Sequence, residues 1–158
     1  MRATWLATGL VLGAACGGGD KNAQTPAAAP AAAVPATSAA APAASNATVH
    51  EVDMTLDGTT PKYSPASLTI KQGDIVRFIN KQGGPHNVSF WADSIPDGAQ
   101  AVLTANMKDQ MAPMESQLLV DVGSTYEISF AGAPAGVYKF YCLPHLAMGM
   151  RGTLTVTK

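Results

Sequence analysis

Four side chains in this sequence of 158 residues carry the donor atoms of a metal site. Cys142, His145 and Met150 lie within nine residues of one another, and His86 stands far upstream between a proline and an asparagine. Two imidazoles, one thiolate and a weak thioether are the donors of a mononuclear site that holds copper and passes single electrons. The sequence therefore predicts that these four residues bind one copper ion.

Two alternatives compete with a copper site at these residues. Zinc could use these ligands, but structural zinc sites rarely include methionine. A buried cysteine with an unrelated histidine and gap-filling methionines is the plain structural alternative, and for Cys142 alone it would be the better one. The complete donor set favours copper, because thiolate and thioether suit Cu(I) while imidazole suits both oxidation states.

The elements that must position these donors are expected to be strands. Alternation in residues 137–141 predicts a strand that ends at Cys142, so that a short loop could wrap one ion from three directions. Residues 48–158 are predicted to form an all-β, two-sheet Greek-key sandwich with one short helix or loop insertion near 99–119. The expected strands are Val49–Leu56, Ser67–Lys71, Asp74–Asn80, Asn87–Trp91, Thr125–Phe130, Gly136–Tyr141 and Gly152–Thr157.

The N-terminal part has the composition of an export signal followed by a linker. Residues 1–15 carry one arginine and an apolar run too short to span a bilayer, and Cys16 follows small residues as in a bacterial lipoprotein processing site. Residues 16–47 are rich in alanine and proline, which breaks helical turns and leaves little to bury. We expect a signal peptide at 1–15, an acylated Cys16 and a disordered tether at 16–47; a plain secretory signal or an uncleaved anchor is the alternative.

Composition excludes some classes of partner. The chain is 47% hydrophobic and 13% charged, with a formal net charge of −1. Such a balance gives no excess of Lys and Arg that could bind nucleic acid.

If Cys16 is processed, Cys142 is left as a single thiol in an oxidising compartment, where it cannot form an internal disulfide.

Several motifs resemble the cupredoxins, the small blue-copper proteins of the plastocyanin and pseudoazurin type. Pro85-His86-Asn87-Val88 is similar to the plastocyanin motif around the first ligand. The segments at 63–65, 68–74 and 76–80 resemble the family's first sheet, and those at 95–99 and 147–152 resemble pseudoazurin. The resemblance implies that His86, Cys142, His145 and Met150 are the copper ligands.

Neighbours of the ligands have expected roles as well. The family spacing places the axial sulfur five residues after the second histidine, which selects Met150, whereas Met148 is expected to pack over the rim of the site. The backbone N–H of Asn87 is expected to bond the Cys142 sulfur, and its side chain to join the two ligand loops. An ordinary loop asparagine is the alternative.

The predicted function is one-electron transfer without catalysis. Three strong ligands and an axial sulfur leave no position for a substrate, which argues against an enzyme and against a small-molecule substrate. The resemblance implies that the ring edge of His145 reaches the surface within an apolar docking patch, here Pro85, Pro144, Leu146 and Ala147. It also implies redox partners such as a c-type cytochrome or a membrane oxidoreductase. We expect a monomer on the periplasmic or cell-surface face of a bacterial membrane, held there by the lipid on Cys16.

Two other functions compete with electron transfer. Met107, Met111 and Met114 could hold Cu(I) weakly, which would suit a periplasmic copper carrier or chaperone, although packing within the loop is the preferred explanation. A metal-free sandwich used for adhesion or assembly is the third possibility. His50 has no partner motif and is expected at the surface or at a sheet edge.

Overall fold

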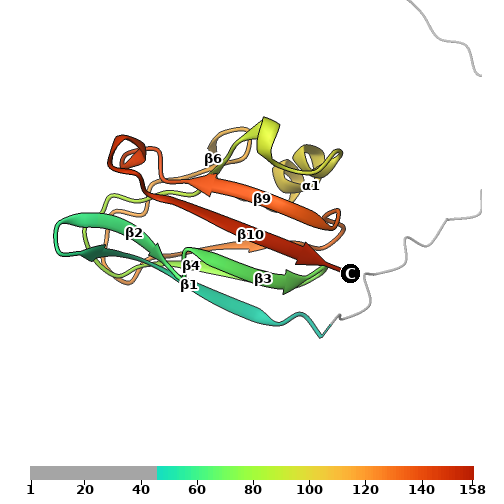
Figure 1. Ribbon diagram of the computed structural model, residues 1–158, viewed down its shortest axis with the longest axis horizontal. Helices are drawn as coiled ribbons and strands as arrows, with labels where there is room; N and C mark the ends of the chain where they lie inside the picture. Colours follow the sequence, from blue (N-terminus) through green and yellow to red (C-terminus); the bar gives the residue numbers. More distant parts are fainter. Residues whose placement is uncertain (1–45) are drawn as a thin grey trace, which may run out of the picture. The chain divides into compact units, whose positions relative to one another are not determined.

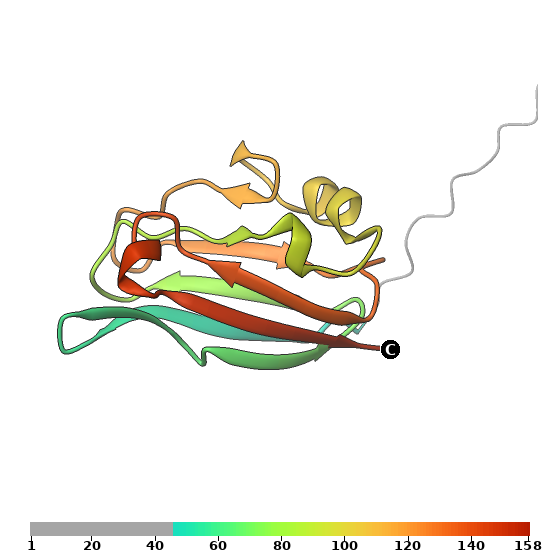
Figure 2. The same ribbon diagram turned by 45° about the horizontal axis from the view of Figure 1, so that its top comes forward.

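The computed structural model describes residues 46–158, which form two β-sheets packed face to face (Figures 1 and 2). The four-stranded sheet has the order β2 (Thr60–Ser64), β1 (Val49–Asp57), β4 (Ile75–Asn80), β8 (Thr125–Ser129). The six-stranded sheet has the order β3 (Ser67–Lys71), β10 (Arg151–Thr157), β9 (Gly136–Tyr141), β5 (Ser89–Phe90), β7 (Glu115–Ser116), β6 (Gln110–Ala112). Helix α1 (Ala99–Asn106) and two short 3₁₀ turns, η1 (Ala92–Ser94) and η2 (Leu146–Met148), lie in the connections.

Both sheets are mixed, because β1 pairs in parallel with β4 and β3 with β10. Alternate residues of the long strands point between the sheets and form the core. Phe78 of β4 and Phe140 of β9 meet edge to face with ring centroids 5.5 Å apart, and Tyr63 of β2 lies 4.8 Å from Phe140. Burying each of these rings stabilises the fold by about 2 kcal/mol, so the core holds β9 firmly up to Tyr141.

The all-β sandwich with a short helix in the 99–119 segment is confirmed. Strands Ser67–Lys71 and Gly136–Tyr141 have the expected bounds. The strand expected at Asn87–Trp91 is only Ser89–Phe90, because Val88 exchanges hydrogen bonds with Ser116 instead of continuing the ladder.

Three strands were not expected. Strand β2 carries a proline, which argues against a strand, yet it pairs with β1 through a hairpin in which Gly58 adopts a φ of +61°. Strands β6 and β7 follow α1 within 99–119 and have three and two residues. Elements that short have no period for a sequence pattern to reveal.

His50 lies on the part of β1 that β2 does not cover, because β2 pairs only with Asp53–Asp57, so the expected edge position is confirmed. Its partner was not expected: His50 Nε2 is 2.9 Å from Oδ2 of Asp74. Asp74 stands in the turn between β3 and β4, so its proximity to His50 arises from the pairing of β1 with β4 and leaves no local signal.

The predicted signal peptide at 1–15, the acylated Cys16 and nearly all of the tether at 16–47 lie outside the described residues. Among residues 46–158, no helix is both long enough and apolar enough to cross a membrane.

Candidate metal centre

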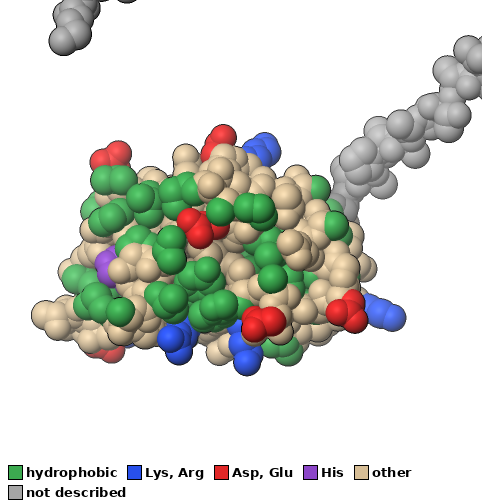
Figure 3. Space-filling view, turned by 90° about the horizontal axis from the view of Figure 1, so that it is seen from above, with side chains coloured by type: hydrophobic (Ala, Val, Ile, Leu, Met, Phe, Trp, Pro, Cys, Tyr) green, Lys and Arg blue, Asp and Glu red, His purple; other side chains and the backbone are tan. Residues whose placement is uncertain are grey.

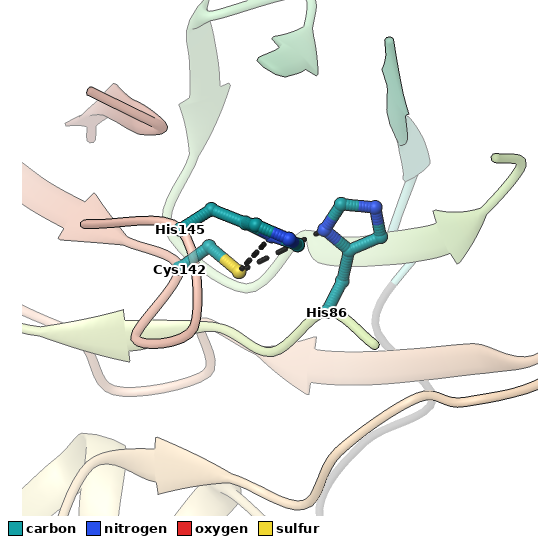
Figure 4. A group of neighbouring side chains, drawn as sticks. All are labelled: His86, Cys142 and His145. Carbon is teal, nitrogen blue, oxygen red and sulfur yellow. Dashed lines mark hydrogen bonds between the residues drawn. The ribbon is translucent and has the colours of Figure 1, made fainter. Parts of the chain in front are cut away.

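Three of the four predicted ligands meet at one end of the sandwich (Figure 4). The donor atoms of His86, Cys142 and His145 all lie within 4.8 Å of one another. The Cys142 sulfur is 3.7 Å from Nδ1 of His86 and 3.4 Å from Nδ1 of His145. Both imidazoles therefore present the same nitrogen to the thiol.

The loop between β9 and β10 supplies Cys142, His145 and Met150. It closes on itself through backbone hydrogen bonds: His145 N–H donates to the Cys142 carbonyl at 3.2 Å, Met150 N–H to the His145 carbonyl at 3.2 Å, and Cys142 N–H to the Met150 carbonyl at 3.1 Å. Three predicted ligands are thus tied to each other through their main chains.

Gly152 fixes how β10 leaves this loop. It stands opposite Phe140 in the ladder, and a Cβ atom on Gly152 would come within 2.2 Å of the Phe140 ring. No side chain fits there, so glycine is required for the close pairing that sets the position of Met150 against Cys142.

His86 is brought to the site by a different part of the chain. It forms an isolated antiparallel bridge with Leu119, whose N–H donates to the His86 carbonyl at 2.7 Å while His86 N–H donates back at 3.1 Å. The Asn80 side chain donates to the Leu119 carbonyl at 3.0 Å. Leu119 and Asn80 were missed from the sequence, because a backbone bridge between distant loops has no residue signature.

The second ring nitrogen of His86 is also occupied. Nε2 lies 2.9 Å from the carbonyl oxygen of Gln82 and donates to it, which leaves Nδ1 unprotonated and directed at Cys142. A ligand histidine is commonly oriented by such a bond from its other nitrogen. The partner is a main-chain carbonyl, so the sequence could not have revealed it.

Asn87 joins the two ligand loops. Its Oδ1 accepts a hydrogen bond from Leu143 N–H at 2.7 Å, and its Nδ2 donates to Ser89 at 3.2 Å. Its carbonyl accepts from the Tyr63 hydroxyl at 2.7 Å, a contact the sequence did not suggest. Asn87 is fully buried, so these bonds form without competition from water.

Burial sets the charge state of the donors. It lowers the pKa values of both His86 and His145, the latter further depressed by the neighbouring His86, so the two rings are neutral and their lone pairs are free. Burial raises the pKa of Cys142, although hydrogen bonds from the backbone N–H groups of Asn87 and His145 oppose the increase. Neither imidazole therefore supplies a positive charge to a Cys142 thiolate.

The donor set fits copper. Two neutral imidazoles and a buried sulfur satisfy the preference of Cu(I) and Cu(II) for soft and borderline donors, and a bound cation would supply the charge that a Cys142 thiolate needs. Among the described residues, these three form the group of His, Cys, Asp and Glu side chains that could hold a metal ion.

The two candidate axial methionines differ in position. Met150 is 1% exposed and its main chain bonds both Cys142 and His145. Met148 is 53% exposed and lies in the η2 turn. The burial of Met150 agrees with a role as ligand, and the exposure of Met148 agrees with a position on the rim.

His145 is the most exposed of the predicted ligands, being half-buried where His86 and Cys142 are buried. Figure 3 shows a histidine at the surface at one end of the domain, with hydrophobic side chains near it. The residues predicted for docking are exposed or half-buried on the loops that carry the ligands: Pro85, Pro144, Leu146 and Ala147.

Comparisons with known proteins show the family to which the chain belongs. The family described as copper binding proteins, plastocyanin/azurin family, matches residues 50–157. Plastocyanin of Prochlorothrix hollandica is 40% identical over 111 residues, which cover 70% of this chain and 75% of that protein. The oxidised plastocyanin of Dryopteris crassirhizoma superimposes with a TM-score of 0.53 at 30% identity, over 68% of this chain and all of that one. A pseudoazurin from Methylobacterium extorquens gives a TM-score of 0.48 at 26% identity, over 70% and 76% of the two chains.

This chain therefore belongs to the plastocyanin/azurin family of copper-binding, electron-transferring cupredoxins.

Proposed function

We propose that this chain is an exported, membrane-tethered electron carrier that holds one copper ion with His86, Cys142, His145 and Met150. The observation that carries the proposal is the convergence of three donor atoms within 4.8 Å at a buried site. When bound there, copper supplies a centre that takes up and releases one electron. Relatives that carry the name plastocyanin support the same function.

The residues of the chain hold the site in one geometry. The backbone bonds within the β9–β10 loop and the Asn87 link to Leu143 restrain the donors, so little rearrangement accompanies a change of charge. Burial of Cys142 and His86 excludes water from the donor atoms. A restrained, dry site with no free position favours electron relay over catalysis.

His145 is the point where electrons enter and leave in this proposal. Its ring belongs to the site and is half-buried, and the docking residues predicted near it on the same loops are apolar: Pro85, Pro144, Leu146 and Ala147. An apolar surface with few charges suits brief docking, because redox encounters bury little area.

Copper carriage is the weaker candidate. Met107 and Met114 are each 4% exposed and belong to the core, while Met111 is 49% exposed. The three thioethers therefore do not gather on the surface where a copper ion could be handed over, and packing explains two of them.

Location and partners are further parts of the proposal. The sequence of residues 1–16 supports export and a lipid on Cys16, which would hold the domain on the periplasmic or cell-surface face of a membrane. We propose a c-type cytochrome or a membrane oxidoreductase as the partner of a monomeric carrier.

The visible spectrum after addition of Cu(II) tests the proposal. We expect one tight equivalent of copper and an intense blue band from the thiolate, which Cys142→Ser abolishes. A triple Met→Leu change at Met107, Met111 and Met114 is the matched control and should leave the stoichiometry at one. A colourless parent protein, or a blue Cys142→Ser variant, would refute the proposed site.

A further inference from the structure

The two sheets carry different charges, because Glu115 of β7 is the one carboxylate among the strands of the six-stranded sheet. Strands β3, β9 and β10 hold three cations, Lys71, Lys139 and Arg151, and no carboxylate. All three are exposed. The strands of the four-stranded sheet instead carry four carboxylates and two cations. The net charge of the chain conceals this asymmetry.

The charges of the four-stranded sheet are internally paired. Arg77 lies 3.1 Å from Glu51 and 2.7 Å from Glu127, and Lys62 lies 2.9 Å from Asp57. Within residues 46–158, by contrast, Lys71, Lys139 and Arg151 have no carboxylate within ion-pair distance. Their charges are available to a partner.

A cleft of about 550 Å³ is lined by two of these cations, Lys139 and Arg151. Trp91 forms part of its wall, stacked on Tyr141 with ring centroids 4.3 Å apart, and the Arg151 guanidinium lies 5.8 Å from the Trp91 ring centre. Ser67 and Thr153 add hydroxyl groups to the lining.

Asp93 is the one carboxylate in this lining, so the cleft keeps an excess of positive charge. A guanidinium held over an aromatic ring, a nearby ammonium group and hydroxyl donors together form a receptor for carboxylates. Because the cations line a recess, protruding side chains reach them better than the flat surface of a lipid bilayer does.

The cleft also lies close to the metal centre along the chain. Tyr141, which supports Trp91, directly precedes Cys142, and Arg151 directly follows Met150. An occupant of this cleft therefore sits beside the strand ends that carry two predicted ligands.

We propose that this basic cleft docks an acidic segment of the redox partner. The inference rests on the proposed electron-transfer function for the identity of that partner. The docked segment must carry several Asp or Glu side chains. One carboxylate bonds Arg151, and a neighbouring carboxylate faces Lys139.

Fluorescence of Trp91 provides the test. The full chain has two tryptophans, so Trp5→Phe leaves Trp91 as the only one. Titration with a hexaglutamate peptide at low salt should give a saturable change in its emission, which weakens as salt is added. Lys139→Glu should weaken the apparent affinity by about tenfold, and Arg151→Gln by a similar factor.

Lys62→Glu is the matched control, because it makes the same change in charge on the opposite sheet. It should leave peptide affinity within about twofold. Equal weakening by Lys62→Glu, or no response of the parent protein to hexaglutamate, would overturn the proposal. So would binding to phosphatidylglycerol vesicles in the absence of peptide binding, which would assign the face to a membrane. Copper-free and copper-loaded samples are titrated in parallel, so a loss of blue colour reports on the copper site separately from peptide binding.

Discussion

Single residues decide the chemistry of this centre through the atoms they leave free. His86 donates from Nε2 to the Gln82 carbonyl and so presents Nδ1 to the sulfur of Cys142. The side-chain oxygen of Asn87 accepts a hydrogen bond from Leu143 N–H, and its side-chain nitrogen donates to Ser89. These hydrogen bonds restrain the donors independently of a metal ion, and such restraint limits the entropy lost on binding.

Asn87→Ala tests the link between the ligand loops. The Leu143 N–H would lose a buried acceptor at 2.7 Å, and an unsatisfied buried donor costs about 1–3 kcal/mol. We expect that loss in the free energy of denaturant unfolding, together with copper affinity that is about tenfold to 100-fold lower in competition titrations. Ser89→Ala removes the contact at 3.2 Å but keeps the bond from Leu143 N–H to Asn87, so it should hold copper nearly as tightly as the parent and serves as control. Equal losses of copper affinity in the two variants would contradict the special role of Asn87.

Met150→Leu and Met148→Leu separate the two methionines. Leucine replaces methionine with little change in volume, so both variants should fold. If Met150 is the axial ligand, its replacement should raise the reduction potential by about 60 mV or more, the value of a tenfold shift in a one-electron equilibrium. Met148 is 53% exposed, and its variant should keep the parent potential and visible spectrum. Redox titration measures both; identical potentials for parent and Met150→Leu would remove Met150 from the ligand set.

At the scale of elements, the sequence predicted what depends on local period and missed what depends on distant pairing. Strand β9 alternates buried Tyr138 and Phe140 with exposed neighbours, and it was predicted to the residue. The donors Cys142, His145 and Met150 share one loop, so their spacing predicted a site. Contacts between loops, such as the bridge from His86 to Leu119, depend on sheet topology and leave no local pattern.

Asp74 fastens the beginning of β1 to the turn before β4. Its carboxylate accepts hydrogen bonds from Lys71 N–H and Thr48 N–H and lies 2.9 Å from His50. The bond from Lys71 N–H, with smaller contributions from His50 and Thr48, holds the pKa of Asp74 below its usual value despite burial.

The pH dependence of unfolding tests this junction. Because the folded pKa of Asp74 is lower than the unfolded one, its contribution to stability is complete above the unfolded pKa and is lost as pH falls through the folded value. Asp74→Asn should lower the free energy of unfolding at neutral pH by about 2 kcal/mol. It should also flatten the decline in stability below about pH 4. Chemical denaturation at a series of pH values measures both; an unchanged acid slope in the variant would disprove the assignment.

At the scale of the whole molecule, the domain has two distinct outer regions near the copper site. One is the mostly apolar end around His145, with Pro85, Pro144, Leu146 and Ala147, and the other is the basic cleft between Lys139 and Arg151. Apolar contact responds weakly to salt, whereas attraction between exposed charges is screened within about 8 Å at physiological ionic strength. The two surfaces can therefore be distinguished by the salt dependence of partner binding.

Cys16→Ser tests how the chain is held in the cell. If Cys16 carries a lipid, the parent protein should sediment with membranes, and the variant should be released as a soluble protein or retain an uncleaved signal. Membrane fractionation with mass measurement of the mature chain decides this. Arg2→Lys, which keeps the charge of the leader, is the control and should fractionate like the parent. A soluble parent protein of unmodified mass would contradict acylation.

Leu146→Glu tests docking at the His145 end of the domain. Leu146 is half-buried beside His145, so a carboxylate there places an unpaired charge inside an apolar contact, where it loses hydration on docking. We expect electron exchange with a c-type cytochrome to slow by about tenfold or more at moderate salt, while the blue absorbance and the rate with a small inorganic oxidant stay near those of the parent. Stopped-flow kinetics over a salt series measures the rates. Val49→Glu, which changes an apolar side chain that is 41% exposed at the beginning of β1 and paired with the first residue of β4, is the matched control. If both variants slow exchange equally, or if Leu146→Glu loses colour in proportion to rate, docking at His145 is wrong.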